Sequence, residues 1–576
     1  MGPELVTALA LVGYFLGYRY YSAWLARRVF QLDADAVTPA HALEDGIDFV
    51  PTRPIVLFGH HYASIAGLAP MLGPAVAVFW GWLPALLWVV LGAVFIGCVH
   101  DFSALVLSAR HRGESIGTLC EDILGGKAKG LFLALIFFGV SLAMGVFVFV
   151  ISKLFSWGDD FDPHALDLAT TSFPEVVMPS AGLMVVALAC GWLLYVKKKP
   201  LLPVTAVGFL LLLALIGLGY LFPTLGFSRD AWPEQSTWIW LLMTYAYLAS
   251  VLPVWLLLQA RDFLNSLLLV LGLLLMYVGF FLQGPSFDAP AFNPNPEGAP
   301  PILPFVFITI ACGAASGFHS LVASGTTARQ LDKETHARPI GYGGMVAESL
   351  LGLIAVLACT CVIPGRDPWA LHYADWHSAS GLGEKLGFFI SGSSAFIAGL
   401  GISLELATTL VAMVVVSFAL TTLDSATRLL RFNLEEIGAA WSKSPLLRGL
   451  GLVLQNRFAA TLTACASICF FAFFKIDGLP AGLTLWTLFG GTNQLIAGLA
   501  LLTATVYLKR KGRNYWPLAL PAVFMVSITM FALISKLVDF YQSDQTLLLT
   551  LDSMLVLIGV GVGGTAVKAL AFDKPR

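Results

Sequence analysis

The chain of 576 residues is 58% hydrophobic and only 12% charged, whereas a soluble domain carries roughly 25% charged residues. Its formal net charge of −2 gives no sign of nucleic-acid binding. The composition excludes an ordinary soluble protein, because so large an apolar surface could not all be kept from water.

The apolar residues gather into segments of about 20, the length that a helix needs to cross a bilayer. The N-terminal segment has Glu4 where a signal peptide has a basic region, so we expect a retained helix. Residues 383–400 are expected to form a re-entrant or interfacial helix on the outer face. The other segments predict about fifteen spans, at 3–26, 53–78, 80–110, 129–153, 175–197, 201–222, 238–261, 264–283, 302–327, 339–364, 405–430, 457–475, 482–508, 517–538 and 547–570.

Charges in the connecting segments predict the orientation in the membrane. Basic residues gather at 197–199, at Arg329 and at 509–513, and these connections fall on one side of the predicted bundle. Asp230 and Asp288 fall on the other side. Because cytoplasmic loops are enriched in Lys and Arg, we expect the N-terminus outside and the C-terminus in the cytoplasm.

Two predicted spans carry proline and polar residues in their interior. The span 53–78 contains Gly67 and Pro70, and the span 238–261 contains Pro253. Proline removes a backbone donor and disturbs the preceding turn, so both helices are expected to break near mid-membrane. Interrupted helices at matching places in two halves are typical of an inverted-repeat transporter, although glycine and proline also occur simply where helices pack closely.

Each predicted broken helix opens a set of five helices, which indicates two repeats of opposite orientation. We therefore expect an all-α polytopic membrane protein with a five-plus-five inverted-repeat core whose first and sixth helices are broken. The expected parts are an extra N-terminal helix and cytoplasmic connector (1–52), a first repeat (53–222), a second repeat (238–430) and C-terminal accessory helices (431–576).

Residues at the two predicted breaks are the candidate substrate-binding groups. Histidine is the side chain whose charge changes near neutral pH, which suits proton coupling or binding of a carboxylate; a histidine that only hydrogen-bonds the broken backbone is the alternative. The candidates are Gly59, His60, His61, Ser64, Gly67, Tyr245, Tyr247 and Ser250.

Two further groups are candidates for ion coupling. His100 and Asp101 place an imidazole beside a carboxylate, an arrangement typical of a proton site. The hydroxyls of the span 302–327 follow one face of a helix and could coordinate sodium, but they could equally serve close packing, so the coupling ion stays open. This second group is Ser316, Ser320, Ser324 and Thr327, with His319 beside them.

Other charged residues in spans have weaker interpretations. Asp424 and Arg428 are four residues apart, so they are expected to pair on one helix, as a structural ion pair or an inner gate. Arg261 is expected to reach the inner interface with its long side chain. Glu348 has no partner that the sequence reveals. Asn493 is expected to hydrogen-bond a neighbouring helix.

Seven short segments resemble signatures of the carbon starvation protein A family. They are FGHHYASIAG (58–67), VHDF (99–102), ASVLPVWLLL (249–258), SGFHSLVASGTT (316–327), IGYGGM (340–345), LTTLDSATRL (420–429) and FGGTNQL (489–495). The resemblance extends from about residue 20 to about residue 510, and the chain beyond matches no motif.

The resemblance implies a secondary active carrier of the bacterial inner membrane, grouped with the amino acid–polyamine–cation superfamily. It implies uptake of peptides by alternating access, coupled to protons or sodium, with pyruvate or another small monocarboxylate as the alternative substrate. The superfamily's five-plus-five inverted-repeat core agrees with the helix count above.

The sequence favours a transporter over an enzyme, because it has no H-E-x-x-H motif, Walker A loop or soluble domain. A channel or a nutrient-sensing membrane protein is the alternative from another class. We expect no cofactor and no metal other than a coupling ion (H+ or Na+). The expected partners are a small-molecule substrate and the lipid bilayer, with no nucleic acid, and a homo-oligomer stays open.

Overall fold

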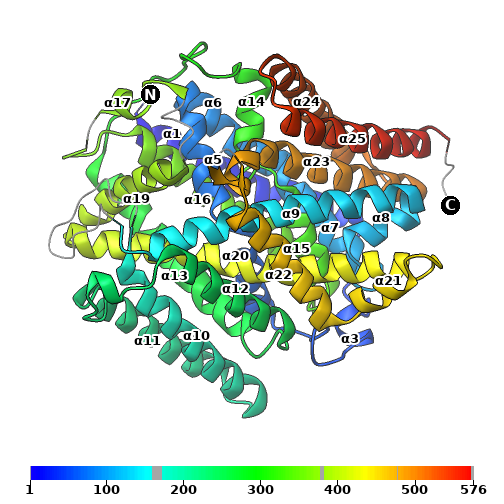
Figure 1. The fold of residues 1–576 in the computed structure, drawn as a ribbon, viewed down its shortest axis with the longest axis horizontal. Coiled ribbons are helices and arrows are strands. Elements are labelled where there is room, and N and C mark those ends of the chain that lie inside the picture. Colours follow the sequence, from blue (N-terminus) through cyan, green and yellow to red (C-terminus); the bar gives the residue numbers. More distant parts are fainter. Residues whose placement is uncertain (1, 159–171, 367, 377–381, 477, 573–576) are drawn as a thin grey trace.

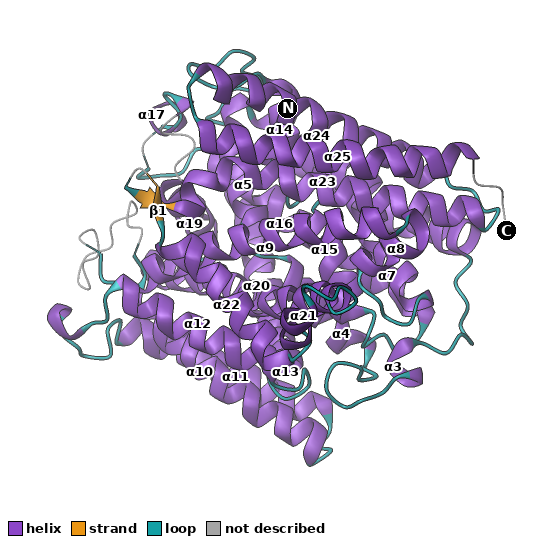
Figure 2. Ribbon diagram, turned by 45° about the vertical axis from the view of Figure 1, so that its right-hand side comes forward, coloured by secondary structure: helices purple, strands orange, loops and turns teal. Residues whose placement is uncertain are grey.

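The computed structural model describes residues 2–158, 172–366, 368–376, 382–476 and 478–572. Most of this part of the chain is helical (Figures 1 and 2). Its only sheet is a small antiparallel pair, β1 (Lys475–Ile476) with β2 (Leu479–Pro480). The all-α membrane fold expected from the sequence is confirmed at this level.

Ten helices in the described ranges are long and apolar enough to cross a membrane, and two bent helix pairs raise the number to twelve. The ten are Trp82–Arg110 (α6, η4 and α7), α9 (Gly126–Phe155), Pro174–Val196 (with α10), α11 (Leu201–Leu221), α13 (Leu258–Gln283), Glu334–Thr360 (with α16), α20 (Leu404–Trp441), α23 (Ala481–Arg510), α24 (Trp516–Gln542) and α25 (Thr546–Phe572). The bent pairs are α4 with α5, and α21 (Arg448–Leu454) with α22 (Arg457–Phe473).

Three other helical segments coincide with predicted spans without meeting that test. They are α1 (Pro3–Leu16), which continues to Phe30, then α12 (Gln235–Val251), and the pair α14 (Ile302–Thr309) and α15 (Gly317–Val322). The expected count of about fifteen is therefore reached only when these segments are included. Helix α19 (Leu382–Ala398), expected to be re-entrant or interfacial, packs against α13, α16 and α20.

The first predicted break is confirmed. Helix α4 (Pro54–Ile65) ends where Ala66 leaves the helical region, and α5 (Ala69–Ala77) continues at an angle of 47°. Pro70 stands at the start of α5, where its missing N–H costs nothing. A side chain on Gly67 would come within 2.8 Å of Thr422 Oγ1, so the break can approach α20 only because this residue is glycine.

The second break was expected in the span 238–261, and this prediction is wrong. Helix α12 ends at Val251, Leu252 is extended before Pro253, and α13 starts a separate helix at Leu258. Pro253 biases Leu252 away from helical geometry, so the proline ends a helix instead of interrupting one. Tyr245, Tyr247 and Ser250 consequently lie in the last turns of α12, away from any break.

An interrupted helical segment lies instead at 302–327, and we call its non-helical stretch the second break. Helix α14 ends at Thr309, residues 310–316 are not helical, and α15 begins at Gly317 before a π-helical stretch, Ala323–Thr327. Gly313 has φ +83°, a backbone conformation that glycine adopts without strain. The expected hydroxyl stripe on one helix face is also wrong, because Ser316 is extended and lies within the break.

Packing places the two breaks at the centre of the bundle. Helix α4 packs on α13, α5 on α16, and α15 on α23, while α9 contacts both α20 and α23. Helices α10 and α11 pack together along one edge of the molecule (Figure 1). Helices α24 and α25 pack on α23 along the opposite edge.

Candidate functional site

A small central cavity of about 30 Å³ lies between the two broken helices. It has room for little more than a water molecule. Its lining includes Gly67 and Pro70 of the first break, Cys312 and Phe318 of the second, Met144 and Phe147 of α9, Thr422 of α20, and Phe489 and Asn493 of α23. The cavity therefore joins both breaks to the helices that enclose them.

A larger cavity of about 620 Å³, here called the vestibule, opens beside residues 298–301. Its walls come from α5, α14, α23 and α24, together with Trp376 and Leu382. Ala69, Cys312 and Phe489 line both this vestibule and the central cavity. Phe489 therefore stands at the boundary between the two spaces.

Four buried titratable groups form a chain beside the second break. His319 of α15 lies with Nδ1 2.9 Å from Asp101 Oδ2 and Nε2 3.0 Å from Glu348 Oε2. Asp101 Oδ1 lies 2.9 Å from His100 Nδ1. The other oxygen of Glu348 accepts the N–H of Gly313, 3.3 Å away. We call these four residues the histidine–carboxylate relay.

The relay can hold protons, because its members are fully buried and their charges are otherwise unbalanced. Two carboxylates and two imidazoles lie together, and no Lys or Arg of the described residues forms an ion pair with them. Burying uncompensated charge is costly, so protons must offset the carboxylates. One end of the relay is the backbone of the second break.

The same cluster contains the one set of potential metal ligands found among the described residues. Donor atoms of Cys312, His319 and Glu348 lie within 4.8 Å of one another. A metal ion there would displace the contact between His319 and Glu348. No metal was expected from the sequence, and imidazole, thiolate and carboxylate together would suit a transition metal such as zinc.

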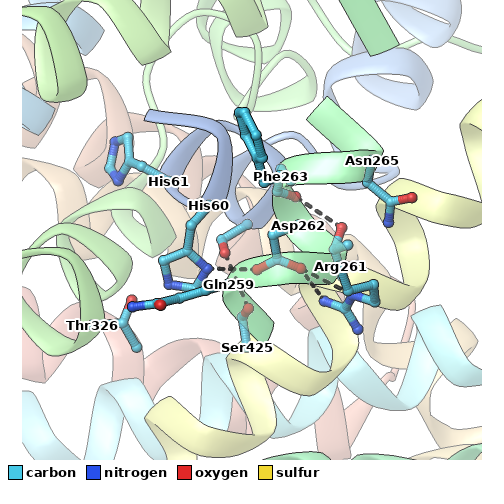
Figure 3. A network of polar contacts seen from close by, with 12 residues as sticks. His60, His61, Gln259, Arg261, Asp262, Phe263, Asn265, Thr326 and Ser425 are labelled. Carbon is cyan, nitrogen blue, oxygen red and sulfur yellow. Dashed lines mark hydrogen bonds and ion pairs between the residues drawn. The ribbon is translucent and has the colours of Figure 1, made fainter. Parts of the chain in front are cut away.

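A second buried polar network connects α4 to neighbouring helices (Figure 3). His60 Nδ1 of α4 lies 2.6 Å from Asp262 Oδ2 of α13. Arg261 bridges Asp262 and Asp424 of α20, and the Tyr245 hydroxyl of α12 donates to Asp424 at 2.6 Å. This inner network, consisting of His60, Asp262, Arg261, Asp424 and Tyr245, ties four helices together.

The structure contradicts two predictions about charged residues. Arg261 was expected to reach the interface, but it is fully buried because Asp262 and Asp424 together neutralise it. Asp424 and Arg428 do not pair with each other. Asp424 turns to Arg261, whereas Arg428 lies one turn further along α20 and meets Asp48, 2.6 Å away.

Asp48 forms a clasp in the loop before α4. It binds Arg428 and, at 3.2 Å, Arg431, so this loop is held against α20. Burial alone would raise the pKa of Asp48, but Arg428, Arg431 and Arg329 more than offset it and lower the pKa below its ordinary value. Asp48 was not singled out from the sequence, since loop aspartates are common.

Most of the remaining candidates for substrate binding contact neighbouring helices instead of lining the central cavity. His61 Nδ1 lies 2.9 Å from Thr327 Oγ1, and His61 and His60 point to different sides of α4 (Figure 3). Ser64 lies 3.1 Å from Ser425, and Ser250 3.4 Å from Thr461. Gly59 lets α4 approach Ser266 of α13. Of the eight residues, only Gly67 lines the central cavity.

The candidate sodium ligands are also occupied. Ser320 donates to Gly317 O at 2.7 Å, and Ser324 donates to Ser320 O at 2.6 Å. Ser316 lies 3.0 Å from Asn493 Nδ2. The expectation that Asn493 hydrogen-bonds a neighbouring helix is confirmed, because its Oδ1 accepts the Phe318 N–H at 2.9 Å.

Sequence reasoning missed two hydroxyls at the first break. Thr421 donates to Ala63 O at 2.9 Å, and Thr422 donates to Ser64 O at 3.2 Å. Both residues belong to α20, and their position in a run of polar residues within a span was the available signal. They hold the carbonyl groups that the first break leaves without helical partners.

Buried ionisable groups beside broken helices, within ten or more apolar spans, define a multi-pass membrane transport protein. The sequence model of the family described as "Carbon starvation protein CstA" matches residues 4–372 and 378–532. The chain belongs to this family.

Curated relatives agree with this assignment. The chain is similar to a peptide transporter CstA of Campylobacter jejuni, with 32% identity over 94% of this chain and 82% of that protein. It is also similar to the pyruvate/proton symporter BtsT of Escherichia coli, with 30% identity over 91% of this chain and 80% of that protein.

Among solved structures, a Na+-coupled sialic acid symporter matches 99% of this chain and 97% of its own, with 12% identity and a TM-score of 0.41. That likeness is too loose to carry an argument.

Proposed function

We propose that this protein takes up short peptides across the inner membrane and couples their uptake to protons. The observation that carries the proposal is the relay from His100 to Glu348, which ends on the N–H of Gly313 in the second break. The same break lines the central cavity through Cys312. A change in the protonation of the relay would therefore alter the backbone that lines the central cavity.

Alternating access is supported by the unequal closure of the two ends of the bundle. The vestibule opens at one end, whereas the inner network and the Asp48 clasp seal the other. With basic loops in the cytoplasm, the N-terminus lies outside, the C-terminus inside, and the vestibule faces outward. The fold then represents an outward-facing state with a collapsed central site.

The positions of the breaks support a revised repeat arrangement. One repeat would comprise the α4–α5 pair, Trp82–Arg110, α9, α12 and α13, with α10 and α11 inserted. The other would comprise the α14–α15 pair, α16, α20, the α21–α22 pair and α23. Matching members pack against each other, α9 on α20 and α12 on α22. These proposed boundaries differ from the expected 53–222 and 238–430.

The substrate carboxylate would lie at the start of α5. The N–H groups of Leu68 and Ala69 precede Pro70 and are free of helical partners, and a helix N-terminus favours an anion. Thr421 and Thr422 already bond the carbonyls of the first break that a sodium ion would need. This favours protons over sodium as the coupling ion.

The test is uptake of labelled dipeptide, tripeptide and pyruvate into proteoliposomes with an inward proton gradient. We expect a peptide to accumulate above its external concentration, and pyruvate to do so if the alternative substrate is correct. Gradient-insensitive equilibration of every compound would contradict coupling and favour a channel or facilitator. Binding without any flux would favour a sensor.

A further inference from the structure

The vestibule contains only two charged side chains among its described lining residues, and both come from an accessory helix. Lys536 and Asp539 lie three residues apart on α24, so they face the same side of that helix. Helix α24 is not among the helices assigned above to the two repeats. Its charged groups nevertheless line the route to the central cavity.

Lys536 and Asp539 do not form an ion pair with each other among the contacts that the structure describes. The Lys536 ammonium donates to the carbonyl of Thr487 on α23 and lies 5.9 Å from the centre of the Phe305 ring. An ammonium has three donors, so this bond leaves two for a ligand. The Asp539 carboxylate accepts no hydrogen bond and forms no ion pair with the residues that the structure describes.

A third acidic side chain lies near the lysine but is not part of the vestibule lining. Asp552 of α25 is fully buried, and neither of its carboxylate oxygens has a hydrogen-bond partner among the described residues. Asp552 and Asp539 both lie close enough to attract the Lys536 ammonium. Lys536 of α24 thus places an ammonium group at the vestibule wall, where a ligand can reach it.

Aromatic rings supply the rest of the vestibule surface. Trp376, Trp486 and Phe540 line its walls, and Phe489 forms its boundary with the central cavity. The rings of Trp486 and Phe489 stack with centroids 4.5 Å apart. An apolar side chain of a ligand can pack on such rings whatever its shape.

We propose that the vestibule is a first binding site for short peptides in their zwitterionic form. The peptide carboxylate binds Lys536, its terminal ammonium binds Asp539, and its side chains pack on the aromatic walls. Side chains three residues apart on a helix start about 5–6 Å from each other, and two extended residues span at most about 7 Å. The spacing therefore suits a dipeptide.

The inference rests on the proposed peptide uptake and adds a site that is separate from the central cavity. It also predicts discrimination between substrates. A monocarboxylate such as pyruvate has no ammonium group, so it gains only the Lys536 contact. Substitution of Asp539 should weaken the binding of peptides and leave the binding of pyruvate unchanged.

The test compares Asp539→Asn, Lys536→Gln and Lys536→Arg with the matched control Asp544→Asn, an exposed residue beyond the end of α24. Equilibrium binding of a labelled dipeptide and of its N-acetylated form is measured on purified protein, with the KM for uptake in proteoliposomes. Circular dichroism and thermal midpoints establish that each variant is folded.

We expect Asp539→Asn to weaken dipeptide binding and raise KM about tenfold or more, the value of one charge-assisted hydrogen bond. N-acetylated dipeptide should bind the Asp539→Asn variant and the original protein equally. Lys536→Gln should weaken both ligands, and Lys536→Arg should restore most of the affinity. The control should behave as the original protein.

Unchanged dipeptide affinity and KM in both Asp539→Asn and Lys536→Gln would overturn the vestibule site while leaving peptide uptake intact. Absence of both binding and uptake in the original protein would overturn the vestibule site and the proposed function together. Binding that depends on Lys536 and Asp539 without uptake would support the site and contradict the proposed function alone.

Discussion

The imidazole Nε2 of His319 lies 3.0 Å from Glu348 Oε2, although the two residues belong to different helices. Glu348 also holds the N–H of Gly313 in the second break. Protonation or deprotonation of Glu348 would therefore change the charge of the carboxylate that the broken backbone binds. In the proposed mechanism, this is how proton binding would act on the shape of the central cavity.

Glu348→Gln should abolish proton-driven accumulation and preserve exchange. The amide oxygen can still accept the Gly313 N–H, but the side chain can no longer gain or lose a proton. The measurement is the internal-to-external ratio of labelled substrate under an inward proton gradient, together with counterflow at equal pH. The matched control is Glu297→Gln in the loop before α14. Accumulation by Glu348→Gln equal to that of the original protein would contradict the coupling role.

Asp262→Asn should destabilise the inner network. Asp262 contacts both His60 and Arg261, and the removal of one partner from a buried ion pair costs about 3–5 kcal/mol. The thermal unfolding midpoint in detergent should therefore fall clearly. Asp35→Asn, at an exposed loop position, should leave the midpoint unchanged. Equal midpoints for the two variants would mean that the network contributes little to stability.

The Asp48 clasp should be insensitive to pH in the working range. The pKa of Asp48 in the folded protein is below its ordinary value of 3.8. Its stabilisation is therefore complete above that ordinary value and is lost only as pH falls through the lower folded pKa. Asp48→Asn should change the transport rate at every pH between about 5 and 8 without moving the profile. A shifted profile would contradict this assignment.

Gly97→Ala should disturb the second break. A side chain at position 97 in the Trp82–Arg110 helix would overlap the carbonyl oxygen of Ala314, which is backbone and cannot turn aside. Overpacking of this kind costs about 1–3 kcal/mol. Gly130→Ala in α9 meets no atom within 4 Å and provides the control. The thermal midpoint should fall for the first variant and hold or rise slightly for the second.

The sequence predicted the first break because Gly67 and Pro70 interrupt an apolar segment. It misplaced the second break because Pro253 gave the stronger local signal, and proline can end a helix as well as interrupt one. The true second break contains no proline between 310 and 316 and depends on Gly313. A single glycine within an apolar segment is common in membrane helices, so it carries little information alone.

The sequence pointed to several residues of the candidate site, but not to the contacts between them. His100, Asp101 and His319 were candidates for ion coupling, and the structure brings them together with Glu348, whose partner the sequence could not reveal. The predicted pairing of Asp424 with Arg428 is wrong because their spacing along one helix was the only information that the sequence offered. Asp48 and Arg261, the actual partners, are distant in the chain.

The most direct test of proton-coupled uptake is substrate-induced acidification inside proteoliposomes that contain a trapped pH-sensitive dye. Dipeptide is added outside with no imposed gradient and no sodium. We predict that the interior acidifies with the original protein and with Glu297→Gln, and that it does not with Glu348→Gln. Dipeptide uptake that requires sodium and leaves the internal pH unchanged would contradict the account.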